Sequence, residues 1–206
     1  MMFSLIESCL RGMGGRIGRY LRYAYYKRRL KACGKGVFID MGVHIINPES
    51  VSIGDGVWID KNCVLIAGKV SIRNEKVKEI ENKDFKGSAG EIHIGSHSHM
   101  GLMTIVQGHG GVWIGPNFTS SAGVKIYSFS NDPGACHTGT MIDPAYVMHP
   151  VQIGQNVWLG LNVVVLGHTI GDDVFVGPNA VITTDIPNGS YVKAGALDFS
   201  QRFKQG

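Results

Sequence analysis

The chain has 206 residues, of which 44% are hydrophobic and 17% are charged, so a buried core is expected and intrinsic disorder is excluded. The 29 glycines follow no every-third-residue pattern, which excludes collagen. The formal net charge of +4 is uneven: residues 1–31 carry eight Lys and Arg against Glu7 alone, a net +7 that leaves −3 for the remainder. This distribution excludes a nucleic-acid surface on the body of the protein.

Several sequence features favour a cytoplasmic protein. No stretch of about 18 apolar residues is present, as a membrane span would need. The segment FSLIESCL is too short, and too interrupted by Glu7, for the core of a signal peptide. The four cysteines form neither a CxxC pair nor a zinc spacing, so we expect reduced thiols: Cys9, Cys33, Cys63 and Cys136.

The basic N-terminal segment predicts a helix over residues 16–31. Its apolar stripe would consist of Ile17, Leu21 and Ala24, with arginines and tyrosines elsewhere on the surface. Because a solenoid exposes its core at each end, the simplest interpretation is a cap over the first coil. A basic, aromatic helix also suits an anionic membrane surface, which would place the protein at the inner face of the membrane.

A six-residue period begins at Ile53. It runs through Ile59 and Leu65, with small or branched residues at Val57 and Cys63. The same period returns in two later blocks: Ile94, Met100, Val106, Ile114, Ser120 and Ile126, then Ile153, Leu159, Val165, Ile170, Val176 and Ile182, with partner positions that include Val157, Val163, Thr169, Val174 and Ala180. One residue is missing between Val165 and Ile170, where the step is five.

This period matches neither a helix nor a simple strand, and it predicts a solenoid with three short strands in each coil. The aliphatic residues would point inward and stack on the same position of the next coil. The turns would fall in IGDG, IGQN and IGDD, whose Gly, Asn and Asp residues tolerate tight backbone geometry. Trp58, Trp113 and Trp158 would point outward.

Two segments interrupt the period. Residues 73–91 alternate Lys and Glu, and we expect a solvated excursion or hairpin. Residues 127–150 form a long polar loop that holds Asp132, His137 and His149. The predicted organisation is a basic helical cap over 1–35, a solenoid over 36–197 with excursions at 73–91 and 127–150, and a tail over 198–206.

The repeats resemble those of the hexapeptide-repeat O-acetyltransferases of bacteria, the group with galactoside, maltose and capsule-polysaccharide acetyltransferases. The resemblance covers roughly residues 36–197 and is most specific in IGQNVWLGLNVVVLGHTIGDDVFVGPNAVITTDIPNGSYVKAGAL. It implies an all-β solenoid, a left-handed parallel β-helix, that assembles as a homotrimer. It also implies acetyl transfer from acetyl-CoA to a sugar hydroxyl, with no metal. The basic helix weakly favours a surface polysaccharide or its precursor as the acceptor.

The resemblance places a catalytic histidine in the polar loop, but this chain has Asp132 at that position, preceded by Asn131. His137 could occupy the same space with Asp132 orienting it, since a neighbouring carboxylate raises the basicity of an imidazole. Alternatively, Asp132 with a raised pKa is the base, or His149 or a histidine of the coils serves. The remaining alternative is a catalytically inactive binding or scaffold protein.

The coenzyme candidates also follow from the resemblance. Trp158 would line the coenzyme groove, and main-chain groups nearby would contact pantetheine: Gly160, Leu161, Gly177 and Pro178. Thr183 and Thr184 would lie near the nucleotide, where relatives have a Thr-Lys pair. The missing lysine charge would come from Lys193, or from Arg202 or Lys204 in the tail.

A metal-dependent hydratase similar to the β-helix carbonic anhydrases is a third hypothesis, since those enzymes bind zinc through three histidines. Alternation would place His97 and His99 on one face, with His93 and His109 nearby. Their spacing does not match the zinc ligands of that family, so we expect outward polar positions instead.

Overall fold

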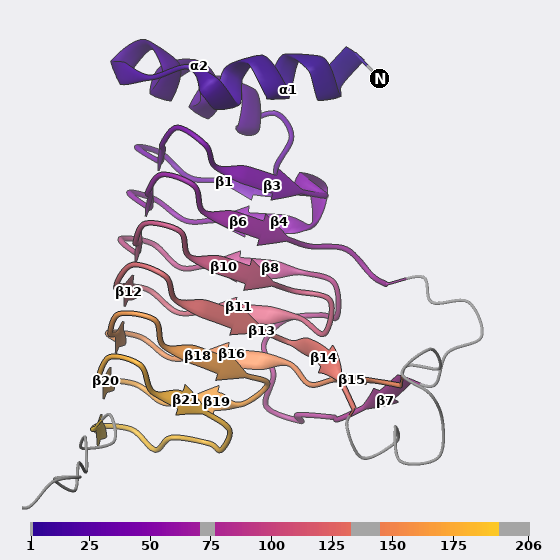
Figure 1. Ribbon diagram of the computed structural model, residues 1–206, viewed down its shortest axis with the longest axis vertical. Helices are drawn as coiled ribbons and strands as arrows, with labels where there is room; N and C mark the ends of the chain where they lie inside the picture. Colours follow the sequence, from indigo (N-terminus) through magenta and orange to yellow (C-terminus); the bar gives the residue numbers. More distant parts are fainter. Residues whose placement is uncertain (1, 71–76, 133–144, 194–206) are drawn as a thin grey trace, which may run out of the picture.

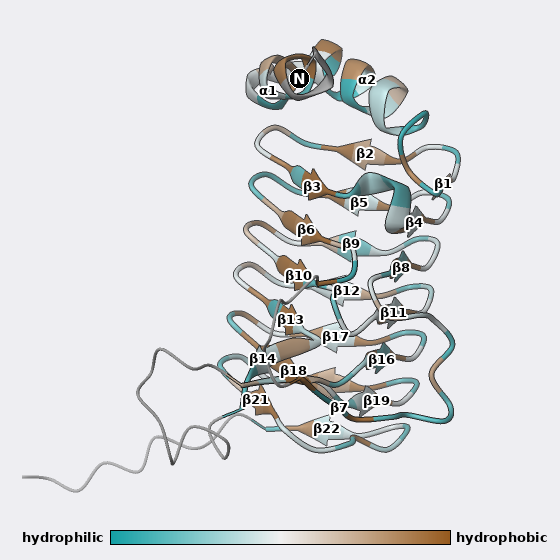
Figure 2. Cartoon of the chain, turned by 90° about the vertical axis from the view of Figure 1, so that its right-hand side faces the viewer, coloured by the Kyte–Doolittle hydropathy of each residue, from teal (hydrophilic) through white to brown (hydrophobic). Residues whose placement is uncertain are grey.

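The computed structural model describes residues 2–70, 77–132 and 145–193, with side chains from residue 5 onward. Three parallel sheets wind around one core as a left-handed parallel β-helix, and two helices lie across its N-terminal end (Figure 1). Successive coils stack in register, so the molecule is long in the direction of the stack (Figure 2). The predicted fold class is confirmed.

Each coil contributes one strand to sheets A, B and C in turn. Sheet A contains β1 (Ala32–Cys33), β4 (Val51–Ile53), β8 (Ile92–Ile94), β11 (Val112–Ile114), β16 (Val151–Ile153) and β19 (Thr169–Ile170). Sheet B contains β2 (Phe38–Ile39), β5 (Trp58–Ile59), β9 (His99–Met100), β12 (Thr119–Ser120), β17 (Trp158–Leu159), β20 (Phe175–Val176) and β22 (Tyr191–Val192). Sheet C contains β3 (His44–Ile46), β6 (Val64–Ile66), β10 (Ile105–Gln107), β13 (Lys125–Tyr127), β18 (Val164–Leu166) and β21 (Val181–Ile182). A 3-10 turn, Pro48–Ser50, precedes β4.

The residues of the six-residue period form the core. In sheet C, equivalent side chains of consecutive coils stack on one another and are all buried: Ile45, Leu65, Val106, Ile126, Val165 and Ile182. Removing an aliphatic side chain of this size from water stabilises the fold by about 1.5–3 kcal/mol. The strands are only two or three residues long, so this stacking, and not strand length, holds the coils together.

The turns confirm the sequence prediction at the last residue of each quoted motif. Gly56, Asn156 and Asp173 have φ angles of 63°, 53° and 56°. These angles lie in the left-handed region, which Gly, Asn and Asp tolerate best. The positive-φ positions therefore fix where one strand of a coil ends and the next begins.

Both excursions leave the solenoid at the same corner, where the chain passes from sheet C to sheet A. Beside that corner, β14 (Phe129–Asn131) pairs antiparallel with β15 (Tyr146–Met148), which pairs parallel with β7 (Val77–Glu79). The described part of 73–91 is largely exposed, as expected of a solvated excursion, but it also makes contacts that the sequence did not predict. Besides pairing through β7, Asn82 donates from Nδ2 to Thr169 Oγ1 over 2.9 Å, and the Lys86 amide donates to Gln152 Oε1 over 2.9 Å.

Thr169 was expected to point inward as a partner position, and this was also wrong. It lies only half buried in β19 and accepts the hydrogen bond from Asn82. The physical reason is the five-residue step from Val165 to Ile170, both of which remain buried. Thr169 therefore comes directly before the inward Ile170 and pairs with Gln152, an outward position of the previous coil.

The N-terminal cap has two helices, α1 (Met2–Gly12) and α2 (Gly15–Tyr26), where the sequence predicted one helix over 16–31. The predicted apolar stripe is also wrong, because Ile17 is 73% exposed and the buried face of α2 consists of Gly18, Arg22 and Tyr26. Segment 32–33, expected to belong to the cap, already forms β1 and pairs with β4.

Arg22 holds the cap together although it carries a charge. Its side chain is 1% exposed and donates to the carbonyls of Leu10, Met13 and Ile39 over 2.8, 2.5 and 2.9 Å. Two of these carbonyls end α1, and the third belongs to the first coil. The guanidinium therefore ties both helices to the solenoid through carbonyls at the end of α1 and in the first coil.

Replacing Arg22 with Met should lower the free energy of unfolding by about 3 kcal/mol, because buried carbonyls lose a charged donor. Chemical denaturation followed by circular dichroism measures this change. The matched control is Arg16→Met on the exposed side of α2, which should change stability by less than about 0.5 kcal/mol. Equal stability of the two variants would contradict the role given to Arg22.

Candidate functional site

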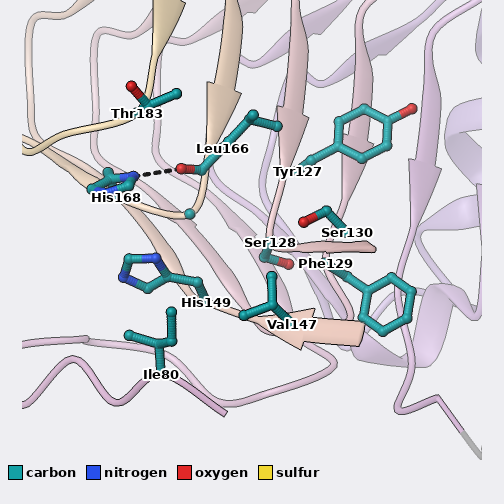
Figure 3. Close-up of a pocket in the computed structure, with 11 residues that line it drawn as sticks. Ile80, Tyr127, Ser128, Phe129, Ser130, Val147, His149, Leu166, His168 and Thr183 are labelled. Atoms are coloured by element: carbon teal, nitrogen blue, oxygen red, sulfur yellow. Dashed lines mark hydrogen bonds between the residues drawn. The ribbon is translucent and has the colours of Figure 1, made fainter. Parts of the chain in front are cut away.

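A pocket lies at the corner between sheets C and A, between the coils and the β14–β15 arm (Figure 3). The arm contributes Phe129, Ser130 and Val147, and Ile80, just after β7, closes the side away from the coils. The coils contribute the ends of β13 and β18 and the start of the next turn: Tyr127, Ser128, Leu166, Gly167, His168 and Thr183. The described ends of the long loop therefore form one wall of this pocket.

Two histidines face each other in this pocket, His149 from the base of the arm and His168 from the short corner. Their ring centroids are 4.7 Å apart, and the planes meet at 65°. His149 fits because the neighbouring residue is Gly167, where an added Cβ would lie 2.4 Å from His149 Cβ. The backbone amide of His149 donates to the Ser128 carbonyl over 3.0 Å, which fixes the base of the arm to the coil.

The tautomer of neutral His168 follows from its hydrogen bond. Nδ1 lies 2.5 Å from the Leu166 carbonyl oxygen (Figure 3). A carbonyl only accepts hydrogen bonds, so Nδ1 must carry the hydrogen. The lone pair of the neutral ring is then on Nε2. A backbone carbonyl on one ring nitrogen is a common way to orient an imidazole that accepts a proton on the other.

His149 favours its neutral form. Burial lowers its pKa, and the nearby His168 lowers it further, whereas the carboxylate of Asp185 opposes both effects. A ring that stays neutral near pH 7 keeps one nitrogen able to accept a hydrogen bond. The pair therefore offers two imidazoles in one pocket, one held in a known tautomer and one held uncharged.

The hydroxyl groups of the pocket differ in their freedom. Ser128 Oγ donates to the Gln107 carbonyl over 2.7 Å and accepts from the Gly110 amide over 3.0 Å, so it is committed to the backbone. Thr183 is exposed at the rim. The Ser128 hydroxyl therefore has a structural role, because both of its hydrogen bonds go to the backbone, and we do not assign it as a nucleophile.

Asn131 and Asp132 lie at the other end of the arm. Asn131 is paired with Tyr146, and the Asp132 amide donates to the Ala145 carbonyl over 2.8 Å. Asp132 is four residues from Ser128, or about 13 Å along an extended strand. His137 lies outside the described residues. The described geometry thus brings His149, but not Asp132, into the pocket with His168.

The coenzyme candidates fall into three groups. The first group comes together at the corner between sheets B and C, where Gly160 and Gly177 are buried and Trp158, Leu161 and Pro178 are exposed. Trp158 and Leu161 are 49% and 53% exposed, so this corner presents apolar surface. Thr183 and Thr184 lie across sheet C, at the corner of the histidine pocket. Lys193 follows β22 and is exposed.

Sheet B carries a row of aromatic side chains that the sequence analysis did not connect. Trp158 packs against Phe175, and Phe175 stacks on Tyr191 with centroids 5.0 Å apart. Nearer the cap, Phe38 contacts Trp58, whose ring contacts His99. The outward prediction for Trp58 and Trp158 is therefore correct. Trp58 lies in register with Phe38 of the preceding coil, and Trp158 lies in register with Phe175 of the next coil.

The coil histidines are engaged separately. His93 stacks on Trp113 with centroids 3.7 Å apart, and His99 Nε2 lies 3.0 Å from Asp60 Oδ2. His109 Nδ1 donates to the Gly68 carbonyl over 2.7 Å, and His97 occupies a turn with φ 60°. Across residues 2–70, 77–132 and 145–193, no three His, Cys, Asp or Glu side chains form a group that could hold a metal ion.

Sequence reasoning did not single out His168, Ile80 or Asn82. The five-residue step between Val165 and Ile170 was the signal for His168, because a shortened corner marks a place where the coil geometry changes. Nothing in the Lys/Glu pattern of 73–91 indicated that Ile80 would lie beside the 127–150 segment, which leaves the solenoid two coils further along.

Comparisons with known proteins agree with this architecture. Residues 145–184 match the family described as Bacterial transferase hexapeptide (six repeats). Galactoside O-acetyltransferase of Escherichia coli K12 is 35% identical over 98 residues, which cover 47% of this chain and 46% of that protein. The chain thus spans less than half the length of the curated relatives it matches.

Solved structures share the fold at low sequence identity. AntD, an N-acyltransferase from Bacillus cereus in complex with dTDP and 3-hydroxybutyryl-CoA, superposes with a TM-score of 0.63 at 21% identity, covering 82% of this chain and 81% of that one. A maltose O-acetyltransferase from Clostridium difficile 630 gives a TM-score of 0.53 at 18% identity, covering 92% of this chain and 78% of that one.

Among the described residues, neither helix has the length and apolar character needed to cross a membrane.

His149 should titrate below the ordinary histidine pKa of about 6.5, because its burial disfavours the charged ring. A proton NMR titration, assigned with His149→Gln, measures this value. Replacing His168 with Gln should raise the pKa of His149, because one of the two effects that lower it is removed. A His149 pKa at or above the ordinary value would contradict the described pocket.

Residues 145–184 thus match the bacterial transferase hexapeptide family, and the chain has the β-helix fold of the solved acyltransferase structures.

Proposed function

We propose that this protein is a cytoplasmic O-acetyltransferase that uses acetyl-CoA. The proposed acceptor is a sugar hydroxyl of a surface polysaccharide or of its precursor. The observation that carries the proposal is the histidine pair at the corner, in which His168 has its lone pair on Nε2 and His149 stays uncharged. A base that removes a hydroxyl proton is what acetyl transfer to a sugar requires.

The proposed reaction uses His168 as the general base. Its Nε2 takes the proton as the acceptor oxygen attacks the thioester carbonyl carbon. The tetrahedral intermediate then collapses, the carbon–sulfur bond breaks, and the coenzyme A thiolate takes the proton from the imidazolium. His149 lies beside this ring and orients the acceptor hydroxyl by a hydrogen bond.

The coenzyme suits the apolar corner between sheets B and C. Leu161 and Trp158 offer exposed apolar surface for the pantetheine arm. Gly160 lets the two coils approach closely at this corner, because an added Cβ would lie 2.7 Å from Pro178 N. Lys193 lies past the end of sheet B, where a cation suits a nucleotide phosphate. These residues are proposed contacts of a cosubstrate.

The two halves of this proposed site lie at different edges of sheet C in one subunit. A cyclic trimer brings different surfaces of neighbouring subunits together, because its interfaces are heterologous. We therefore propose a homotrimer in which the apolar corner of one subunit faces the histidine pocket of the next. The acetyl group would be transferred across that interface.

Asp132 and His137 remain the other proposed catalytic pair, with Asn131 beside them. In this alternative His137, which lies outside the described residues, is the base and Asp132 orients it. The second proposed class of function is a binding or scaffold protein without turnover, motivated by Asp132 in place of a histidine. The experiment below distinguishes this class from the acetyltransferase.

The first experiment measures thiol release from acetyl-CoA with a panel of sugars as acceptors. AntD is described as an N-acyltransferase, so the panel includes amino sugars beside neutral ones. Replacing His168 with Asn should reduce sugar-dependent kcat by about 10²–10⁴-fold, because the general base is lost. His149→Asn should cost less, because that ring orients the acceptor and does not take its proton.

His137→Ala and Asp132→Ala are the matched comparisons. Under the proposal they retain most of the activity that His168→Asn loses. Loss of activity in these two variants, with His168→Asn active, would move the base to the loop. Coenzyme binding without turnover on any sugar would favour the scaffold protein, and no coenzyme binding at all would contradict the proposed function.

A further inference from the structure

The outer face of the N-terminal cap combines exposed apolar side chains with cations. In α2, the buried residues Gly18, Arg22 and Tyr26 define the face that meets the first coil. At 100° per residue, the opposite face contains Arg16, Ile17, Tyr20 and Lys27. Ile17 and Tyr20 are 73% and 70% exposed, which is unusual for side chains of this size in a helix that caps a core.

Helix α1 continues this face. Glu7 points to the solenoid side, where it accepts from the Tyr26 hydroxyl over 3.1 Å. Leu5 and Cys9 lie on the opposite side of the same helix, and Leu5 is 69% exposed. Met13, between the two helices, is also exposed. We call the exposed set Leu5, Met13, Arg16, Ile17, Tyr20, Lys27 and Arg28 the outer cap face.

The cations of this face differ from the other basic residues of the cap. Arg11, Arg19 and Lys31 are paired with Glu7, Asp40 and Glu91. Arg16 and Arg28, by contrast, make no ion pair with the described residues, and Lys27 lies over the Tyr23 ring at 5.5 Å. The charges on the outer cap face are therefore available to an anionic partner.

A hollow at the edge of the cap adds a second polar feature. It is lined by Arg16, Arg19, Tyr20 and Tyr23, together with the start of the first coil at Val37 and Phe38. Arg19 is paired with Asp40 and the Tyr23 hydroxyl donates to the Gly34 carbonyl, so the guanidinium of Arg16 and the hydroxyl of Tyr20 are the groups that suit a phosphate here. The hollow opens beside Tyr20, which connects it to the apolar part of the outer cap face.

The position of the cap determines what this face can meet. Both helices lie across the end of the stack, roughly perpendicular to its long direction (Figure 1). An extended surface that contacts the outer cap face therefore runs parallel to both helix axes, and the solenoid projects away from it. The charges reinforce this orientation, because residues 1–31 carry a net +7 and the remainder of the chain carries −3.

We propose that the outer cap face binds the surface of an anionic phospholipid membrane. Ile17, Leu5 and Met13 would enter the region between headgroups and acyl chains, and Tyr20 would lie at the headgroup level, where tyrosine is favoured. Arg16, Lys27 and Arg28 would contact lipid phosphates. The inference does not depend on the proposed reaction, because it uses none of the residues assigned to it.

Sedimentation of the full-length protein with vesicles tests this proposal. The protein should pellet with vesicles of phosphatidylcholine and phosphatidylglycerol, and it should remain in solution with phosphatidylcholine alone. Raising the salt concentration should weaken the binding, because salt screens the surface potential of the lipid. The triple variant R16S/K27S/R28S should bind about 100-fold more weakly, at about fivefold for each cation.

The matched control removes three exposed lysines outside the cap, K69S/K78S/K83S, which gives the same net charge. This variant should bind the anionic vesicles like the wild type. The double variant I17S/Y20S should lose the part of the binding that survives high salt, and circular dichroism should show both helices retained.

Three outcomes would overturn the proposal. Equal loss of binding in the two triple variants would indicate a general charge effect. Equal pelleting with neutral and anionic vesicles would exclude the role of the cations. Self-association that I17S/Y20S abolishes, without vesicle binding by the wild type, would show that a second copy of this chain covers the face instead.

Discussion

Inward stacking of aliphatic side chains from one coil to the next is the constraint on which the rest of this structure depends. Each coil buries side chains at the same positions as its neighbours. Adding or removing one residue within a strand would therefore turn its buried side chains to the surface. Insertions and deletions are tolerated only at corners. The corner between sheets C and A accepts both excursions and the shortened step that carries His168.

The candidate site is a direct consequence of this concentration at one corner. Because β7, β14 and β15 leave from equivalent places on different coils, they can pair with one another and form a wall that no coil provides. Gly167 turns the shortened corner tightly enough for His149 to pack against it. The polar chemistry thus lies outside the repeat, on a base that the repeat keeps rigid.

The fold could be read from the sequence because the six-residue period repeats at each buried position, and a single irregular residue does not hide it. The turn residues Gly56, Asn156 and Asp173 were equally readable, since their backbone geometry requires those residue types. The site was less readable. The pairing of β7 with β15 joins segments about 70 residues apart, and such pairing leaves no local pattern.

The cap shows the same limit in another form. A helix with Arg22 on its buried face contradicts the expectation that apolar residues define the inward stripe. The charge is tolerated there because three backbone carbonyls receive the guanidinium, and those carbonyls become neighbours only in the folded chain. Because the face with Arg22 packs on the first coil, the opposite face of α2, which carries Ile17, points to the outside.

The claim that the site joins two corners of neighbouring subunits is tested most directly by subunit mixing. His168→Asn disables the pocket and Leu161→Arg disables the apolar corner, so each variant alone should be inactive. Co-refolded in equal amounts, the two should recover about a quarter of the wild-type activity, because that fraction of interfaces pairs an intact pocket with an intact corner. No recovery in mixed trimers would contradict a site shared between subunits and place both halves in one chain.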